Sequence, residues 1–213
     1  MRHAGKENDR VARGAGSLVL RRPVGRHYEE SQIARSIKTS LDLKEEPEVA
    51  LRGFPFLTEM VQGRISSCTV SVDSLTEGRI RFSDIQLLLV DLTFSVRQFL
   101  EGNVRAIHAH RGVGTASIRQ RDLNTFLRAH GVPFMVSFRN GQTVARLSSL
   151  SAPIDLGLRI SDGSLEISAG SLPAVSVPLP SALHGIVYGS ARPGQGRLLL
   201  NFRLEHPTLD LTR

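Results

Sequence analysis

A long stretch of alternating apolar and polar residues, starting at Ile65, constrains the fold of this chain more than any other feature. Apolar side chains recur mostly at every second position on both sides of Glu77 and Gly78, at Val70, Val72, Ile80, Phe82, Ile85, Leu87 and Leu89. A period of two is that of a β-strand with one buried face, and Glu77 and Gly78 mark a turn. The stretch therefore predicts a hairpin of two long strands in an antiparallel sheet that buries one face.

Strand signals continue along the rest of the chain. Asn140-Gly141 and Asp162-Gly163 are strong hairpin signals, and residues 193–196 supply a last turn with one proline and two glycines. A stretch punctuated by Pro173, Pro178 and Pro180 leads to a short apolar segment at 183–187. The further strands expected are 104–118, 134–139, 143–150, 154–160, 165–168 and 197–205.

Three segments show helical spacing instead. In residues 29–41 one apolar face is formed by Ile33, Ala34, Ile37 and Leu41. Residues 91–102 and 121–130 follow the same spacing, and each ends at or beside a glycine that can cap a helix. Arg119 or Gln120 stands where Ser, Thr, Asp or Asn would cap the last helix, which weakens its start by about 1 kcal/mol.

These patterns predict an α+β fold. We expect one domain over residues 28–213, with a long twisted antiparallel sheet curled over one long N-terminal helix and two or three short helices. The chain of 213 residues, 40% hydrophobic and 22% charged, is long enough to bury one sizeable core. Its single cysteine, Cys68, rules out an intramolecular disulfide and a multi-thiolate metal site.

The segment from Leu51 to Gly63 holds the densest group of large apolar residues outside the strands. A proline is tolerated at the start of a helix, and after Pro55 the residues Phe56, Leu57, Met60 and Val61 recur at the spacing of one helix face. This predicts a short apolar helix next to the first long strand. The helix either closes the end of a hydrophobic core or offers an apolar binding surface.

The net charge of +7 is concentrated at the N-terminus. Residues 1–27 carry seven Arg or Lys and two acidic residues, which leaves the remaining 186 residues at only +2. We expect a disordered basic arm, able to contact the phosphates of nucleic acid or of anionic lipids. Its apolar run, residues 17–20, is too short for a secretory signal peptide, and no run in the chain approaches the length of a transmembrane helix.

Groups able to carry catalysis are scattered. His108 and His110 share one strand face, but no Asp, Glu or Cys ligand is close in sequence. Residues 112–117 resemble half of a dinucleotide-binding loop, but they lack its third glycine and have strand patterns on both sides. No nucleophile elbow, zinc-binding helix or phosphate-binding loop occurs, so the sequence predicts a protein that is not an enzyme and has no cofactor or metal.

One pattern in the chain points to a known family. Gly53-Phe54-Pro55-Phe56-Leu57, followed by Gly63, then alternating strands and then Arg121-Asp122-Leu123-Asn124, resembles the LmeA-like phospholipid-binding family of bacterial cell-envelope proteins. The resemblance implies an architecture related to tubular lipid-binding domains, in which a curved sheet and helices leave an apolar groove for acyl chains. It also implies a cell-envelope or periplasmic location. In that family an anchor or export signal usually precedes the domain, and none is readable in this sequence.

The resemblance turns the apolar helices into candidate lipid-binding elements. The expected groove residues are Phe54, Phe56, Leu57, Met60, Phe99, Leu100, Leu123 and Leu127. Arg64, Arg79 and Arg81 are candidates for contacts with a phosphate head group. The expected partner is thus a phospholipid or a membrane surface, with no nucleic acid bound by the folded part. The alternative is an interaction or scaffold protein with a fully packed core, whose basic arm binds nucleic acid or an acidic partner.

Overall fold

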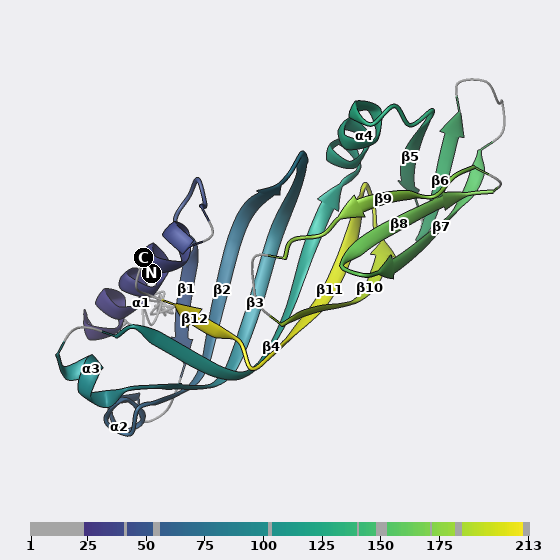
Figure 1. Ribbon diagram of the computed structural model, residues 1–213. Helices are drawn as coiled ribbons and strands as arrows, with labels where there is room; N and C mark the ends of the chain where they lie inside the picture. The colour runs from purple at the N-terminus through teal and green to yellow at the C-terminus, as the bar shows by residue number, and fades with distance from the viewer. Residues whose placement is uncertain are drawn as a thin grey trace, which may run out of the picture.

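The structure is a computed structural model that describes residues 24–40, 42–52, 56–101, 104–139, 141–147, 153–170, 172–181 and 185–210. It is elongated and built from two antiparallel sheets with one helix between them (Figure 1). The other three helices lie at the end of the larger sheet that is away from the smaller sheet. The expectation of a sheet-dominated α+β fold is confirmed in this general form. Most of the predicted arm, residues 1–23, lies outside the described residues, so its role stays a prediction.

The larger sheet has seven strands. They are β1 (Glu48–Arg52), β2 (Arg64–Glu77), β3 (Ile80–Phe94), β4 (Ala106–Arg119), β10 (Ile186–Pro193), β11 (Arg197–Glu205) and β12 (Thr208–Asp210). The spatial order is β1-β2-β3-β4-β11-β10, and β12 pairs with the first residues of β4. The predicted hairpin of two long strands is confirmed, because β2 and β3 pair along almost their whole length on either side of Gly78.

The prediction of a single sheet is wrong, because the structure contains a second, five-stranded sheet. It contains β5 (Phe134–Arg139), β6 (Gln142–Leu147), β7 (Ile154–Ser161), β8 (Ser164–Ala169) and β9 (Val175–Pro178). The cause is the helix α4 (Gln120–Ala129), which carries the chain away from β4, so that β5 pairs with β6 instead. The predicted turn at Asp162-Gly163 is confirmed, and both residues have the positive φ of a tight hairpin turn.

The other helices gather at the end of the molecule opposite α4 (Figure 1). They are α1 (Val24–Ser40), α2 (Phe56–Val61) and α3 (Val96–Leu100). The prediction of a helix over residues 91–102 is wrong in its first part, because Asp91 to Phe94 complete β3, where they lie between β2 and β4. A central strand position overrides the helical spacing there, since both neighbouring strands satisfy its backbone.

Helix α1 lies inside the curl of the larger sheet. Its predicted apolar residues Ile33, Ala34 and Ile37 are buried, whereas Leu41 falls outside the described residues. At this end the sheet has β1 at one edge and β12 at the other, and α1 contacts both. A helix that touches two edges of one sheet requires that sheet to curve around it. The buried Glu30 fixes the helix, since its Oε1 accepts the Leu51 N–H at 3.1 Å.

The curvature of the sheet depends on a change in the alternation of buried residues at one level of β2, β3 and β4, which we call a step. Along β3, Leu89 and Leu92 are both buried although they stand three positions apart, and Asp91 between them has φ +54°. The paired positions on β2 (Ile65 and Cys68) and on β4 (Ala109 and Gly112) are buried at the same spacing. The register between the strands is unbroken at this level, so each strand has one extra residue between two buried positions, which returns its apolar side chains to the same face.

Asp91 tests this account of the bend. Valine strongly disfavours positive φ, so we expect Asp91→Val to lower the free energy of unfolding in urea by about 1–3 kcal/mol. Asp91→Gly should stay within about 1 kcal/mol of the parent. Asp73→Val is the matched control, because Asp73 is equally exposed on β2 but is not among the positive-φ residues. Equal stability of the two valine variants would contradict the account.

Helix α4 joins the two sheets through side-chain amides. The Asn124 Nδ2 donates to the Val136 carbonyl at 2.9 Å, and its Oδ1 accepts the Val136 N–H at 2.7 Å. Gln120 Oε1 accepts the Phe138 N–H at 3.0 Å. These bonds satisfy backbone groups on the outer edge of β5. As the sequence predicted, Arg119 precedes the helix without a capping side-chain hydrogen bond.

We expect Asn124→Ala to lower the free energy of unfolding by about 1–3 kcal/mol, because it leaves the Val136 N–H and carbonyl without their partner. Thr125→Ala is the control on the same helix, since the exposed Thr125 hydroxyl bonds only to the Arg121 carbonyl within its own helix. It should cost less than about 0.5 kcal/mol. Urea titration of both variants provides the comparison, and equal losses would show that the amide does not join the sheets.

Candidate functional site

The inner face of the seven-stranded sheet, defined here as the face that Cys68, Val70 and Val72 share, carries continuous apolar rows. Register pairs the residues across β2, β3, β4, β11 and β10. One row is Val70, Leu87, Gly114, Phe202 and Tyr188; the row on its α1 side is Cys68, Leu89, Gly112, Leu204 and Ile186. The next row contains Val72 and Ile85, followed across the register shift between β3 and β4 by Ala116, Leu200 and Ala191. Every position in these three rows is apolar, glycine or, at Tyr188, amphipathic.

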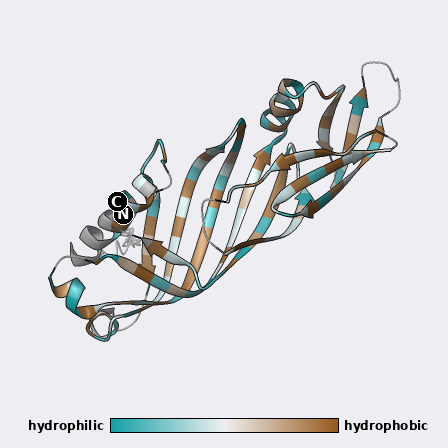
Figure 2. Ribbon diagram, viewed as in Figure 1, coloured by the Kyte–Doolittle hydropathy of each residue, from teal (hydrophilic) through white to brown (hydrophobic). Residues whose placement is uncertain are grey.

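Burial along these rows is uneven. Cys68, Leu89 and Leu204 are almost fully buried, whereas Val72, Ile85, Ile186, Tyr188 and Ala191 are only partly buried. Helices α1 and α4 lie toward opposite ends of the sheet (Figure 1). Of the partly buried residues, Val72, Ile85 and Ala191 share the row farthest from α1, and Tyr188 lies in the row before it. Figure 2 shows apolar segments recurring side by side across the middle strands. The middle of the inner face is therefore the region where an apolar ligand could add contacts.

Two glycines on β4 leave space on this face that neighbouring side chains fill. A Cβ atom on Gly114 would stand 2.5 Å from Cε2 of the Phe202 ring and 2.7 Å from the Gln86 carbonyl oxygen. A Cβ on Gly112 would stand 3.0 Å from Cδ2 of Leu89. The Phe202 ring thus packs directly on the backbone of β4. Residues 112–117 lie within the central strand β4, as the strand patterns on both sides predicted, and do not form a dinucleotide-binding loop.

Tyr188 carries the polar group at the border of the inner face. Its hydroxyl donates to the Pro180 carbonyl at 2.7 Å, so the segment after β9 reaches over β10. Burial raises the pKa of Tyr188 well above its usual value, and the charge of Glu77 raises it further. Glu77 ends β2, and three strands separate β2 from β10. The larger sheet curves around α1, and we call its inner face between α1 and α4 the trough (Figure 1).

The only cysteine, Cys68, lies at the α1 end of the trough and has an unreactive thiol. Burial raises the pKa of the Cys68 thiol to about 12, with a smaller contribution from the charge of Glu30 on α1. Cys68 therefore stays protonated at neutral pH, and a protonated thiol is neither a nucleophile nor a metal ligand. What the described part of the inner face offers a ligand is apolar contact area.

The predicted groove residues do not form one wall. Met60 on α2 is buried, Leu100 on α3 is exposed, and Leu123 and Leu127 on α4 are completely buried. Helices α2 and α4 lie at opposite ends of the sheet, separated by the 14 residues of β4, or about 45 Å. Phe54 lies outside the described residues, as do the side chains of Phe56, Leu57 and Phe99. A lipid-binding role for these eight residues stays a prediction.

The three predicted head-group arginines are also divided. Arg64 begins β2, whereas Arg79 and Arg81 lie at the hairpin beyond the other end of that strand. All three are exposed, and Arg81 Nη2 donates to Ser74 Oγ at 2.9 Å. They cannot contact one phosphate group together, because 14 residues of extended chain lie between them.

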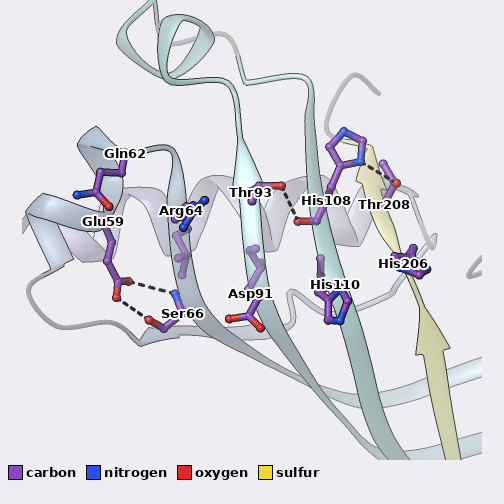
Figure 3. Close-up of a pocket in the computed structure, with 13 residues that line it drawn as sticks. Glu59, Gln62, Arg64, Ser66, Asp91, Thr93, His108, His110, His206 and Thr208 are labelled. Atoms are coloured by element: carbon purple, nitrogen blue, oxygen red, sulfur yellow. Dashed lines mark hydrogen bonds between the residues drawn. The ribbon is translucent and has the colours of Figure 1, made fainter.

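A polar depression of about 810 Å³ lies on the face of the sheet opposite α1 (Figure 3). Arg64, Thr93, His108 and Thr208 form one row across its strands, and His108 Nδ1 lies 3.0 Å from Thr208 Oγ1. The predicted common face of His108 and His110 is confirmed, since both are exposed and Ala109 between them is buried. Within the described residues, no group of three or more His, Cys, Asp or Glu side chains could hold a metal ion.

The comparison with protein families decides the assignment. The model of the LmeA-like phospholipid-binding family matches residues 23–208, nearly the whole chain. The protein belongs to this family. Neither the curated proteins nor the solved structures contain a significant match to the chain. No helix among the described residues of this LmeA-like protein is long and apolar enough to cross a membrane.

Membership changes how the apolar rows are interpreted. The sequence predicted lipid contacts on the short helices, beside strands that bury one face. The alternation on β2 and β3 was a sufficient signal for Val72, Ile85 and Leu87. The positions of Phe202 and Tyr188 on the inner face depend on the pairing of β4, β11 and β10. This pairing connects residues about 90 positions apart in the LmeA-like chain, so the local pattern could not predict it.

Gly114 provides a test of the trough. We expect Gly114→Ala to lower the free energy of unfolding by about 1–3 kcal/mol, because the new methyl group must displace the Phe202 ring. Gly189→Ala is the matched control on β10, where only the Asn201 carbonyl oxygen comes near, at 3.9 Å. It should be neutral or slightly stabilising. Urea unfolding of both variants measures the difference, and a neutral Gly114→Ala would rule out the close packing.

Proposed function

We propose that this protein binds a phospholipid without catalysing a reaction on it, and that the acyl chains lie along the inner face of the seven-stranded sheet. The observation that carries the proposal is the uninterrupted apolar rows across five strands, partly exposed in the middle, in a chain of a phospholipid-binding family. The family and the absence of a nucleophile motif support a binding role in maintenance of the bacterial cell envelope.

The dimensions of the inner face suit an acyl chain. From β2 to β10 the row that contains the partly buried Val72, Ile85 and Ala191 crosses four strand spacings, or about 19 Å. Half the hydrocarbon thickness of a bilayer, the space that one acyl chain occupies, is about 15 Å. Each methylene withdrawn from water contributes about 0.8 kcal/mol, so area on this face is enough to hold a chain without polar contacts.

The first test asks whether the purified protein carries lipid. Native mass spectrometry should show a stoichiometric added mass, and solvent extraction of the same sample should release a phospholipid. A protein that shows no added mass and takes up no offered phospholipid would contradict the proposal. The inner face would then be an ordinary core.

A matched pair of substitutions locates the lipid. Ile85 is partly buried on the inner face of β3, and Leu88, three residues away, is exposed on the outer face. We expect Ile85→Trp to fill the middle of the trough and reduce phospholipid uptake at least about tenfold, whereas Leu88→Trp should leave uptake unchanged. Circular dichroism and urea unfolding check that both variants are folded. Equal uptake by the two folded variants would remove the lipid from this face.

A further inference from the structure

The two most exposed large apolar side chains of the described residues lie at one end of the molecule. Leu100 on α3 is 78% exposed and Val61 on α2 is 74% exposed, whereas the next, Met135, is 51% exposed and lies on the other sheet. Single exposed apolar residues are common and need no explanation. Two apolar side chains that are this exposed on neighbouring short helices form an apolar surface, which indicates a binding partner.

Gly63 holds α2 and α3 together. The Phe94 N–H donates to the Gly63 carbonyl at 3.0 Å, and a Cβ on Gly63 would stand 2.7 Å from the Phe94 carbonyl oxygen and 2.9 Å from Cγ2 of Val96. Gly63 follows Val61 by two residues, and Val96 begins α3. The two helices therefore form one tip beyond the ends of β2 and β3, which we call the α2–α3 tip (Figure 1).

Arginines flank both helices of the tip. The four exposed arginines at this end are Arg52, Arg64, Arg97 and Arg105. Against them stand Glu59, Asp91 and Glu101, which leaves one net positive charge among these described side chains. Glu59 is directed to β2, where it accepts bonds from the N–H and hydroxyl of Ser66, and Glu101 pairs with Arg97 at 2.9 Å. No salt bridge within the described residues engages Arg52, Arg64 or Arg105.

We propose that the α2–α3 tip docks on the surface of an anionic phospholipid bilayer, with Val61 and Leu100 entering the boundary between head groups and acyl chains. This inference rests on the proposed phospholipid-binding function. Apolar side chains bordered by arginines suit this boundary, because the arginines stay at the level of the phosphates. Two such side chains are too small for a stable protein interface, which buries about 800 Å² on each partner, and together with the arginines they provide a weak, reversible contact with a membrane.

The test is flotation of the full chain with vesicles of phosphatidylcholine alone or mixed with phosphatidylglycerol. The parent protein should float with the mixed vesicles, and less so at high salt. We expect the double variant Val61→Ser and Leu100→Ser to bind these vesicles at least about tenfold more weakly. Met135→Ser is the control, since it removes an exposed apolar side chain at the other end of the molecule.

A second measurement separates docking from lipid binding. Uptake of a short-chain phospholipid below its micelle concentration, followed by native mass spectrometry, requires no membrane. The double variant should keep this uptake while it loses flotation. Unchanged flotation of the double variant, equal loss in Met135→Ser, or loss of short-chain uptake as well would overturn the docking proposal. A parent protein that takes up short-chain lipid but does not float overturns docking alone, whereas one that takes up no lipid at all overturns the proposed function.

Discussion

Three central strands of 14 or 15 residues must keep one apolar face inward while the sheet curls, and the rest of the structure depends on this constraint. A strand that twists continuously rotates its side chains away from a single direction. The step shared by β2, β3 and β4 at Asp91 resolves the conflict, since it bends all three strands at one level and restores the inward direction of the apolar residues. Asp84, at φ +52°, marks a second step, where the register between β3 and β4 shifts.

The two ends of the trough are closed by different interactions. At one end the buried Glu30 ties α1 to the edge strand β1. At the other, Asn124 and Gln120 tie α4 to the edge of β5. In both cases a side chain bonds to the backbone of an edge strand, which specifies position more sharply than apolar contact does. Asn124 belongs to the short motif that suggested the family, so part of that motif serves the joint between the sheets.

Local pattern predicted most of the strands and the turns at Gly78, at Asp162-Gly163 and at residues 193–196. It missed the turn between β11 and β12, where His206 has φ +49°. The central strands were clear because alternation over many residues is difficult to produce by another fold. The short strands β1, β9 and β12 were missed, since three to five residues carry too little pattern and owe their conformation to their partners. The division into two sheets was missed for a related reason, because the hairpin signals after α4 specify neighbours in sequence but not which sheet they join.

The candidate site was harder to predict than the fold, because apolar residues at helical spacing have two uses. Leu123 and Leu127 have the spacing of a binding face but are completely buried where α4 packs on the sheets. Leu100 is also a leucine on a short helix, yet it is the most exposed large apolar side chain described. Only tertiary packing separates these cases. The same strands that line the trough end at the α2–α3 tip, so β2 and β3 connect the proposed lipid face with the proposed membrane contact. The proposed lipid face and the proposed membrane contact thus lie on one continuous hairpin of two long strands.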